Sequence, residues 1–425
     1  MPSPILPVFE YRLDFNRMPI SIRTTETHQA AAEARPAISA GSSRLASLDV
    51  VRGLTIAAMI VVNDPGTWSA LYWPLAHADE LMSEHPSGSY AGKWWIDANQ
   101  WTPTDLVFPF FLFIVGVSMA LSFANRANRG DSRGTLIKHV ALRSILLLLI
   151  GWVLHLQPYF DFSRMRFPGV LPRIAVVYLC ASIIVLWSAK RGRIVWIAGL
   201  LIGYYLTLRY IPVPGCERTE WMTQHCSLAG WIDRTLMAGH LYRPDFDPEG
   251  LLSTLPAIAT TLIGTLVGEY LREQVTWSSK LRNVAIAGAL GVAAGYAWHP
   301  FFPIYKPLWT SSYVLFTAGA ACLLLALCSW LIEVRGWRWW DRPFVWLGSN
   351  AILIYVLSMF FAVQGYVIKI KDHGVDVGVQ DWIYRHWFAP LAQPQNASLA
   401  FALCYAALWT LVAWGFYRKK IFLRL

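Results

Sequence analysis

Charged residues are scarce in this sequence. Asp, Glu, Lys and Arg together make up 15% of the 425 residues, whereas hydrophobic residues make up 56% and the mean hydropathy is +0.40. A soluble domain usually carries about 25% charged residues, so the polar surface of an ordinary soluble enzyme is missing. The sequence has 22 tryptophans, and tryptophan is enriched at membrane–water interfaces. The composition therefore predicts a polytopic membrane protein.

Three further patterns are missing from the sequence. Residues 1–43 hold no apolar core segment, so we expect a disordered cytoplasmic tail and no cleaved signal peptide. Cys and His show no metal-ligand spacing, so we expect no metal site. The two halves of the chain do not resemble each other, although an inverted repeat is typical of many transporters.

The six cysteines fall into two groups. Cys180, Cys322, Cys328 and Cys404 lie in apolar segments, where we expect buried, unreactive thiols. The other two, at positions 216 and 226, share one polar segment. They can form a disulfide if that segment faces an oxidising compartment, or stay unpaired, and the sequence leaves both alternatives open.

Apolar runs predict about ten transmembrane helices, because a spanning helix needs roughly 20 mostly apolar residues. The ranges are Leu48–Val62, Asp105–Ala124, Ile137–Leu156, Val170–Trp187, Ile194–Ile211, Leu251–Leu271, Val284–Trp298, Ser312–Ile332, Phe344–Val363 and Leu399–Phe416. The predicted fold class is thus an all-α polytopic membrane protein, with a transmembrane domain over residues 44–425.

Basic residues orient this predicted bundle. With the N-terminus in the cytoplasm, 24 of the 36 Lys and Arg residues fall on the cytoplasmic side, as the positive-inside rule requires. Both termini are therefore expected in the cytoplasm. The net charge of +10 comes from these short clusters between apolar runs, so it does not indicate nucleic-acid binding.

The first predicted helix carries polar residues on one face. Asp49 and Arg52 are three residues apart and can pair, and Asn63 lies 11 residues beyond Arg52, almost a whole number of turns further. Ionisable groups in spanning helices usually face a partner or a cavity. The alternative is a local anchoring pair with Asn63 as a helix-end cap.

The second predicted helix begins with a carboxylate. Asp105 lies in the first turn, and Pro109 has no N–H to bond the Asp105 carbonyl, so that carbonyl needs protein or a wet cavity as its partner. Asp105 is either functional or simply favoured by the helix dipole. His77 and His85 lie in the preceding loop, where a histidine is either a general base or merely solvated.

Three further polar residues interrupt or flank apolar segments. Arg173 follows Pro172 at the start of the fourth helix, Lys306 precedes the eighth, and Asn350 lies within the ninth. Each is ambiguous from the residues alone, since Arg173 and Lys306 could simply extend their charged ends to the membrane surface.

Several ordered blocks resemble one known family. They are Arg44-Leu-Ala-Ser-Leu-Asp-Val-Val-Arg-Gly53, Val62-Asn-Asp-Pro-Gly66, His77-Ala78, Thr104-Asp-Leu-Val-Phe-Pro109, Gly169-Val-Leu-Pro-Arg-Ile174, Asp247-Pro-Glu-Gly-Leu251, Leu308-Trp-Thr-Ser-Ser-Tyr-Val314 and Ser349-Asn-Ala-Ile352. From Arg44 to the C-terminus the chain resembles heparan-α-glucosaminide N-acetyltransferase and its bacterial relatives.

The resemblance implies transfer of an acetyl group from cytosolic acetyl-CoA to an amino sugar or glycan across the membrane. It implies His77, Asn63 and Asp105 as catalytic residues. We expect Asp49 and Arg52 to shape the entry of acetyl-CoA, and assign Arg173, Lys306 and Asn350 to the same ligand.

Residues 79–100 look like an insertion relative to the family, which leaves His85 as an alternative to His77. The expected location is the inner membrane of a bacterium, in contact with the lipid bilayer and with the active site toward the periplasm. A homodimer is compatible with this location. The rival function is a sugar or metabolite transporter, because polar residues in helix bundles also mark permeation paths.

Overall fold

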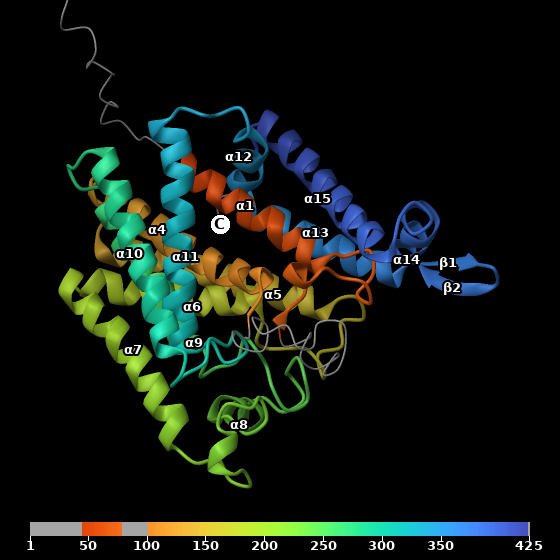
Figure 1. Cartoon of the computed structure of the whole chain (residues 1–425), viewed down its shortest axis with the longest axis horizontal. Helices are drawn as coiled ribbons and strands as arrows, with labels where there is room; N and C mark the ends of the chain where they lie inside the picture. Colours follow the sequence, from red (N-terminus) through yellow and green to blue (C-terminus); the bar gives the residue numbers. More distant parts are fainter. Residues whose placement is uncertain (1–44, 79–100, 424–425) are drawn as a thin grey trace, which may run out of the picture. The chain divides into compact units, whose positions relative to one another are not determined.

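The computed structural model describes residues 45–78 and 101–423. The predicted tail over residues 1–43, His85 and the predicted insertion over residues 79–100 lie outside the described residues. The described chain from Leu45 onward forms one compact unit, drawn in colour in Figure 1.

This unit is built almost entirely from helices. In chain order they are α1 (Ala46–Asn63), η1 (Trp73–Leu75), η2 (Pro103–Leu106), α4 (Val107–Ala127), α5 (Arg133–Leu156), α6 (Val170–Trp187), α7 (Lys190–Tyr210), η3 (Arg218–Glu220), α8 (Leu228–Leu236), α9 (Thr254–Tyr270), α10 (Trp277–Trp298), α11 (Ser311–Ser329), η4 (Trp330–Val334), α12 (Arg342–Ser349), α13 (Ala351–Val367), α14 (Val379–Ile383), η5 (Tyr384–Phe388) and α15 (Pro394–Arg418). One antiparallel hairpin, β1 (Lys369–Asp372) with β2 (Val375–Gly378), follows α13.

Helix α9 lies at the centre of the bundle, against α4, α6, α7 and α11. Most of its side chains are buried, and its small residues allow close packing: a Cβ added to Gly264 would lie 2.2 Å from the carbonyl oxygen of Phe113 in α4. Outward apolar side chains such as Leu142, Val195 and Leu411 are exposed. Such exposure is expected where a helix faces lipid.

Helices α1 and α12 pack backbone to backbone through two glycines. A Cβ on Gly53 would lie 1.9 Å from the Phe344 carbonyl oxygen, and one on Gly348 would lie 2.0 Å from the Asp49 carbonyl oxygen. Only glycine permits this approach. The Asp-Val-Val-Arg-Gly segment of α1 is thus part of a helix-packing contact as well as a polar face.

All ten predicted spanning ranges overlap helices, although the sixth, Leu251–Leu271, begins three residues before α9. The ninth range is broken at Asn350 into α12 and α13, which meet at 83°. Among the described residues, six helices are long and apolar enough to span a membrane, or seven if this bent pair is one span. Helix α9, with 17 residues, is too short to be counted. The membrane-type helical fold is confirmed, while the count of ten spans and the side of the termini stay predictions.

The segment between α7 and α9 carries a disulfide and the short helix α8. Cys216 and Cys226 are bonded with an S–S distance of 2.07 Å, which decides between the two alternatives left by the sequence. In Figure 1 this segment lies at the end of the bundle where α7 ends and α9 begins.

Candidate functional site

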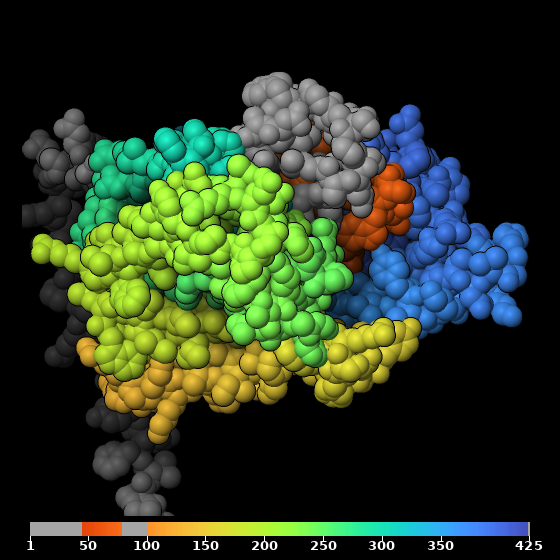
Figure 2. Space-filling view, turned by 90° about the horizontal axis from the view of Figure 1, so that it is seen from below, coloured from red at the N-terminus to blue at the C-terminus, as the bar shows by residue number. Residues whose placement is uncertain are grey.

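A cavity of about 460 Å³ opens at one end of the helices. Figure 2 shows the segments that line it meeting around a recess: the orange segment after α1, the yellow end of α5, the green segment before α9 and the blue α13. Its polar and aromatic lining residues are Asn63, Trp68, His77, His155, Arg166, Tyr242, Arg243, Glu249, Lys306 and Tyr355. A cavity of this size can hold a small-molecule substrate.

His77 and Asp105 form a close pair at this cavity. His77 Nδ1 lies 2.7 Å from Asp105 Oδ1; the Asp105 side chain is fully buried, whereas that of His77 is 24% exposed. Because a carboxylate only accepts, a hydrogen bond to Asp105 requires the tautomer that carries its proton on Nδ1. The other ring nitrogen, Nε2, is then the basic atom of the imidazole.

The backbone and one side chain hold Asp105 in place. Its Oδ2 accepts from the Thr102 N–H at 3.0 Å, the Ala78 N–H at 3.2 Å and the Thr102 hydroxyl at 3.3 Å. The fold therefore joins the segment that carries His77 to the start of η2 through one carboxylate. This geometry is that of an orienting acid behind a histidine.

Lys306 forms an ion pair with Asp105 and lies against His77. Its Nζ lies 3.3 Å from Asp105 Oδ1 and 2.9 Å from His77 Nδ1. The Lys306 side chain is only 16% exposed, so its ammonium balances the buried carboxylate. The sequence assigned Lys306 to cofactor binding; the structure places it beside the predicted catalytic pair, 229 residues from His77.

Asn63 ends α1 at the cavity. Its amide nitrogen lies 3.9 Å from the Met359 sulfur of α13, which is a weak contact that leaves the amide able to bind a ligand. The structure therefore brings Asn63 to the same cavity as His77 and Lys306, with Asp105 directly behind His77.

Four other predicted residues do not line this cavity. Arg52 Nη1 bonds Asp49 Oδ1 at 3.1 Å and the Gly348 carbonyl at 3.2 Å, and its Nη2 bonds the Ser118 hydroxyl at 2.7 Å. Along α1, Arg52 and Asn63 are about 16 Å apart at 1.5 Å per residue. Asp49 and Arg52 thus lie toward the opposite end of α1 from Asn63 and the cavity.

Asn350 and Arg173 have partners within the fold. Asn350 bonds the C-terminal segment, through Nδ2 to the Ile421 carbonyl and through Oδ1 to the Leu423 N–H, both at 3.0 Å. Buried Arg173 donates to the Gly250 carbonyl at 3.1 Å and to the Ser253 hydroxyl, and its guanidinium lies 5.0 Å from the ring centre of Trp309. A role of either in acetyl-CoA binding stays a prediction.

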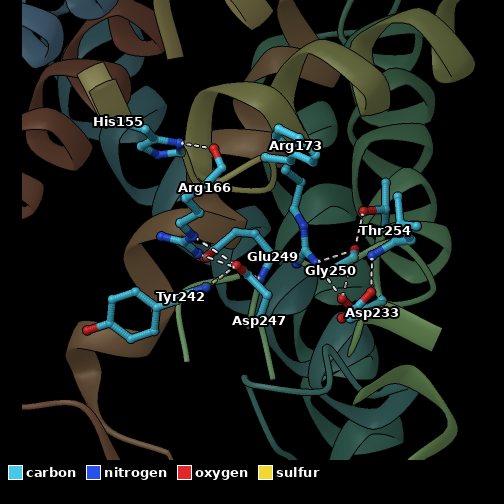
Figure 3. Close-up of polar contacts among 12 residues, drawn as sticks. His155, Arg166, Arg173, Asp233, Tyr242, Asp247, Glu249, Gly250 and Thr254 are labelled. Atoms are coloured by element: carbon cyan, nitrogen blue, oxygen red, sulfur yellow. Dashed lines mark hydrogen bonds and ion pairs between the residues drawn. The ribbon is translucent and has the colours of Figure 1, made fainter. Parts of the chain in front are cut away.

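A second charged network lines the cavity, and sequence reasoning assigned none of it. Arg166 binds Asp247 with two hydrogen bonds, at 2.8 and 2.6 Å, and Glu249 with one at 2.5 Å. Figure 3 shows these residues beside His155 and Tyr242. Burial lowers the pKa of the Arg166 guanidinium, but the bonds and charges of Asp247 and Glu249 outweigh it and hold that pKa above its usual value. The only sequence signal was the Asp247-Pro-Glu-Gly-Leu251 block.

His155 is a second histidine at the cavity. Its Nδ1 lies 2.9 Å from the carbonyl oxygen of Arg166, so a backbone oxygen holds its tautomer. A neutral carbonyl stabilises a protonated imidazole less than a carboxylate does. His77, with Asp105 behind its ring, therefore has the histidine–carboxylate arrangement that His155 lacks.

The apolar helical bundle is that of a multi-pass membrane protein, and its cavity carries the His77–Asp105 pair. A family model described as heparan-alpha-glucosaminide N-acetyltransferase, catalytic, matches residues 44–299, more than half of the chain. The protein belongs to this family. The matched region includes Asn63, His77, Asp105 and Glu249.

Two curated relatives carry the name heparan-alpha-glucosaminide N-acetyltransferase. The Homo sapiens protein is 29% identical over 91% of this chain, and the Mus musculus protein is 28% identical over 90% of it. The chain spans 60% of the length of each relative.

Proposed function

We propose that the protein is a transmembrane acetyltransferase. It transfers the acetyl group of cytosolic acetyl-CoA to the amino group of an amino sugar or glycan at the periplasmic face of a bacterial inner membrane. The observation that carries this proposal is the His77–Asp105 pair, 2.7 Å apart, at the wall of a cavity of about 460 Å³. The family supports the reaction class, since both curated relatives are named as N-acetyltransferases.

The acceptor amine, in its neutral form, attacks the carbonyl carbon of the thioester. His77 Nε2 takes the proton that the nitrogen loses, a step that commonly contributes about 10²–10⁴-fold to the rate. Asp105 holds Nδ1–H and stabilises the imidazolium that forms. The pair provides the base that a direct transfer needs.

The carbonyl oxygen gains negative charge as the nitrogen attacks. The amide group of Asn63 faces the same cavity and donates a hydrogen bond to that oxygen, the role of an oxyanion-hole donor. When the intermediate collapses, the C–S bond breaks and the coenzyme A sulfur takes the proton from His77. The N-acetyl product and free coenzyme A then leave, and His77 is neutral again.

The route of acetyl-CoA follows α1 in this proposal. Asp49 and Arg52, at the start of that helix, shape the entry from the cytoplasm, and the thioester reaches Asn63 at its other end. Arg173 and Asn350 support the same ligand. Replacement of Arg52 by Ala then weakens acetyl-CoA binding, and an unchanged affinity would remove Arg52 from the route.

The Cys216–Cys226 disulfide supports the outward side of the cavity. Disulfides persist in oxidising compartments such as the periplasm, and this segment continues into Tyr242, Arg243, Pro248 and Glu249, which line the cavity. The acceptor accordingly enters from the periplasmic side.

A sidedness assay separates this function from sugar transport. Proteoliposomes receive isotope-labelled acetyl-CoA on one side only, with glucosamine trapped on the other. Labelled N-acetylglucosamine on the glucosamine side supports the transferase. Movement of unmodified glucosamine without acetyl-CoA, and no acetylated product, would identify a transporter instead.

A further inference from the structure

The buried carboxylate of Asp247 fixes a small polar platform in the cavity wall. Its side chain is fully buried. Oδ1 accepts from Arg166 Nη2 at 2.6 Å and from the Glu249 N–H at 2.9 Å, and Oδ2 accepts from Arg166 Nε and the Tyr242 N–H, both at 2.8 Å. One carboxylate thus orients three residues of the lining. A site held by such hydrogen bonds is rigid before any ligand arrives.

Arg166 and Glu249 present paired donor and acceptor groups to the cavity. Glu249 uses Oε2 for Arg166 Nη2, while its Oε1 has no hydrogen-bond partner among the described residues. Arg166 uses Nε and Nη2, which leaves Nη1. Both side chains line the same cavity as His77. The Glu249 Oε1 atom can accept a hydrogen bond from one hydroxyl of a ligand. The neighbouring Arg166 Nη1 group can donate one to a second hydroxyl.

Aromatic rings also line this cavity. Tyr242 and Trp68 are 58% and 49% exposed, and both line the cavity. The guanidinium of Arg166 lies 4.8 Å from the ring centre of Tyr242, and Figure 3 shows the two side chains next to Asp247 and Glu249. Apolar walls with a few fixed polar groups are typical of small-molecule sites, and they suit a sugar ring, which has C–H faces and hydroxyl edges.

We propose that Arg166 and Glu249 form the subsite that binds neighbouring ring hydroxyls of the acceptor sugar. The inference rests on the acetyltransferase function proposed above. Asp247 is the positioning residue of this subsite. The acceptor is accordingly a hexosamine whose amine lies at His77 while its hydroxyl edge lies at Glu249. The subsite contributes to the affinity for the acceptor and takes no part in the acid–base step.

Deoxy analogues of glucosamine test this subsite on the unmodified protein. Steady-state kinetics with purified protein compare glucosamine with its 3-deoxy, 4-deoxy and 6-deoxy forms. A hydrogen bond to a charged group contributes enough for about tenfold to a hundredfold in affinity. We expect at least one analogue to raise the acceptor KM by about that factor. Equal KM values for all four sugars would overturn the proposal.

The variant Glu249→Gln supplies the second test, with Glu273→Gln as the matched control. Glu273 is an exposed residue paired with Lys190. Glu249→Gln should raise the glucosamine KM about tenfold or more, leave the acetyl-CoA KM unchanged, and lose most of the discrimination against the sensitive analogue. Unchanged glucosamine KM in a folded variant, or undiminished discrimination, contradicts the subsite. If Glu249→Gln does not fold, the analogue series alone decides.

The two proposals fail differently. If the unmodified protein acetylates no amine at all, both the transferase function and the subsite are wrong. If it acetylates glucosamine and deoxyglucosamines equally well, the transferase stands and only the subsite is overturned.

Discussion

The hydroxyl of Tyr313 donates a hydrogen bond to the backbone carbonyl of Asp105 at 2.5 Å. In a regular helix that carbonyl would accept from the N–H of residue 109, but residue 109 is proline and has none. Tyr313, fully buried on α11, supplies the missing donor. The contact thus anchors the turn that carries the candidate catalytic carboxylate.

We predict that Tyr313→Phe destabilises the protein by about 1–3 kcal/mol, the usual cost of a buried polar group left without a partner. Restoring a backbone donor with Pro109→Ala should recover part of this loss. Thermal inactivation of the two single variants and the double variant in detergent forms a double-mutant cycle. If the stability changes of the two single variants simply add in the double variant, the Tyr313 hydroxyl does not replace the missing N–H of residue 109.

The second prediction concerns Asp105→Asn, a nearly isosteric change. If the Asn oxygen keeps the bonds from Thr102 and Ala78, the amide NH₂ faces His77 Nδ1. It then favours the wrong tautomer, as in the related change in serine proteases. We expect kcat to fall about 10²–10⁴-fold while the KM for acetyl-CoA changes little.

The exposed Asp376 provides the matched control for that change. Asp376→Asn should leave kcat unaffected. A folded Asp105→Asn protein with normal turnover would show that the carboxylate does not orient the base.

The third prediction concerns Lys306→Met. Removing one partner of a buried ion pair leaves an uncompensated charge, which typically costs about 3–5 kcal/mol. We expect lower thermal stability and a lower kcat, with the KM for acetyl-CoA unchanged, because Lys306 lies 3.3 Å from Asp105. A selective rise in that KM at normal kcat would instead support the role in cofactor binding that the sequence suggested.

The fourth prediction concerns pH and the buried Asp233 of α8. Burial, aided by the nearby charge of Asp247, raises the pKa of Asp233 to about 7 from 3.8. Its Oδ1 accepts from the Leu251 N–H at 2.9 Å, and Oδ2 is buried without a hydrogen-bond partner among the described residues. The folded protein therefore favours the protonated acid.

The sign of the effect follows from linkage. At a pH below 3.8 the acid is protonated in both states, so it imposes no penalty. Between pH 4 and 7 only the unfolded chain ionises readily, so folding stability falls as the pH rises. We expect Asp233→Asn to reduce the loss of melting temperature between pH 5.5 and 8.5. An identical loss in both proteins would contradict the shifted pKa.

Local patterns predicted much of this architecture. Apolar runs located all ten helical ranges, and Pro109 indicated that the Asp105 carbonyl needs a tertiary partner. Gly53 follows Arg52 directly in α1, but the close contact of Gly53 with Phe344 depends on a helix nearly 300 residues away. The bend at Asn350 likewise follows from packing and carries no proline signal.

Long-range side-chain contacts were beyond the reach of sequence periodicity. Arg166 meets Asp247 across 81 residues, and Lys306 meets His77 across 229. From the sequence alone, each of these residues would be predicted to be a charged loop residue near a membrane surface. Only the family resemblance marked the blocks that contain Asp247, Glu249 and His77, and it did not give their mutual contacts.

One measurement tests the central claim, that the His77–Asp105 centre transfers acetyl groups. Purified protein receives isotope-labelled acetyl-CoA and glucosamine, and mass spectrometry counts the N-acetylglucosamine formed by the unmodified chain, by His77→Asn and by His373→Asn. His373, whose side chain is 94% exposed, is the control. We predict labelled product from the unmodified chain and the control, and a loss of about 10²-fold or more in folded His77→Asn. Equal product from all three proteins would contradict the account.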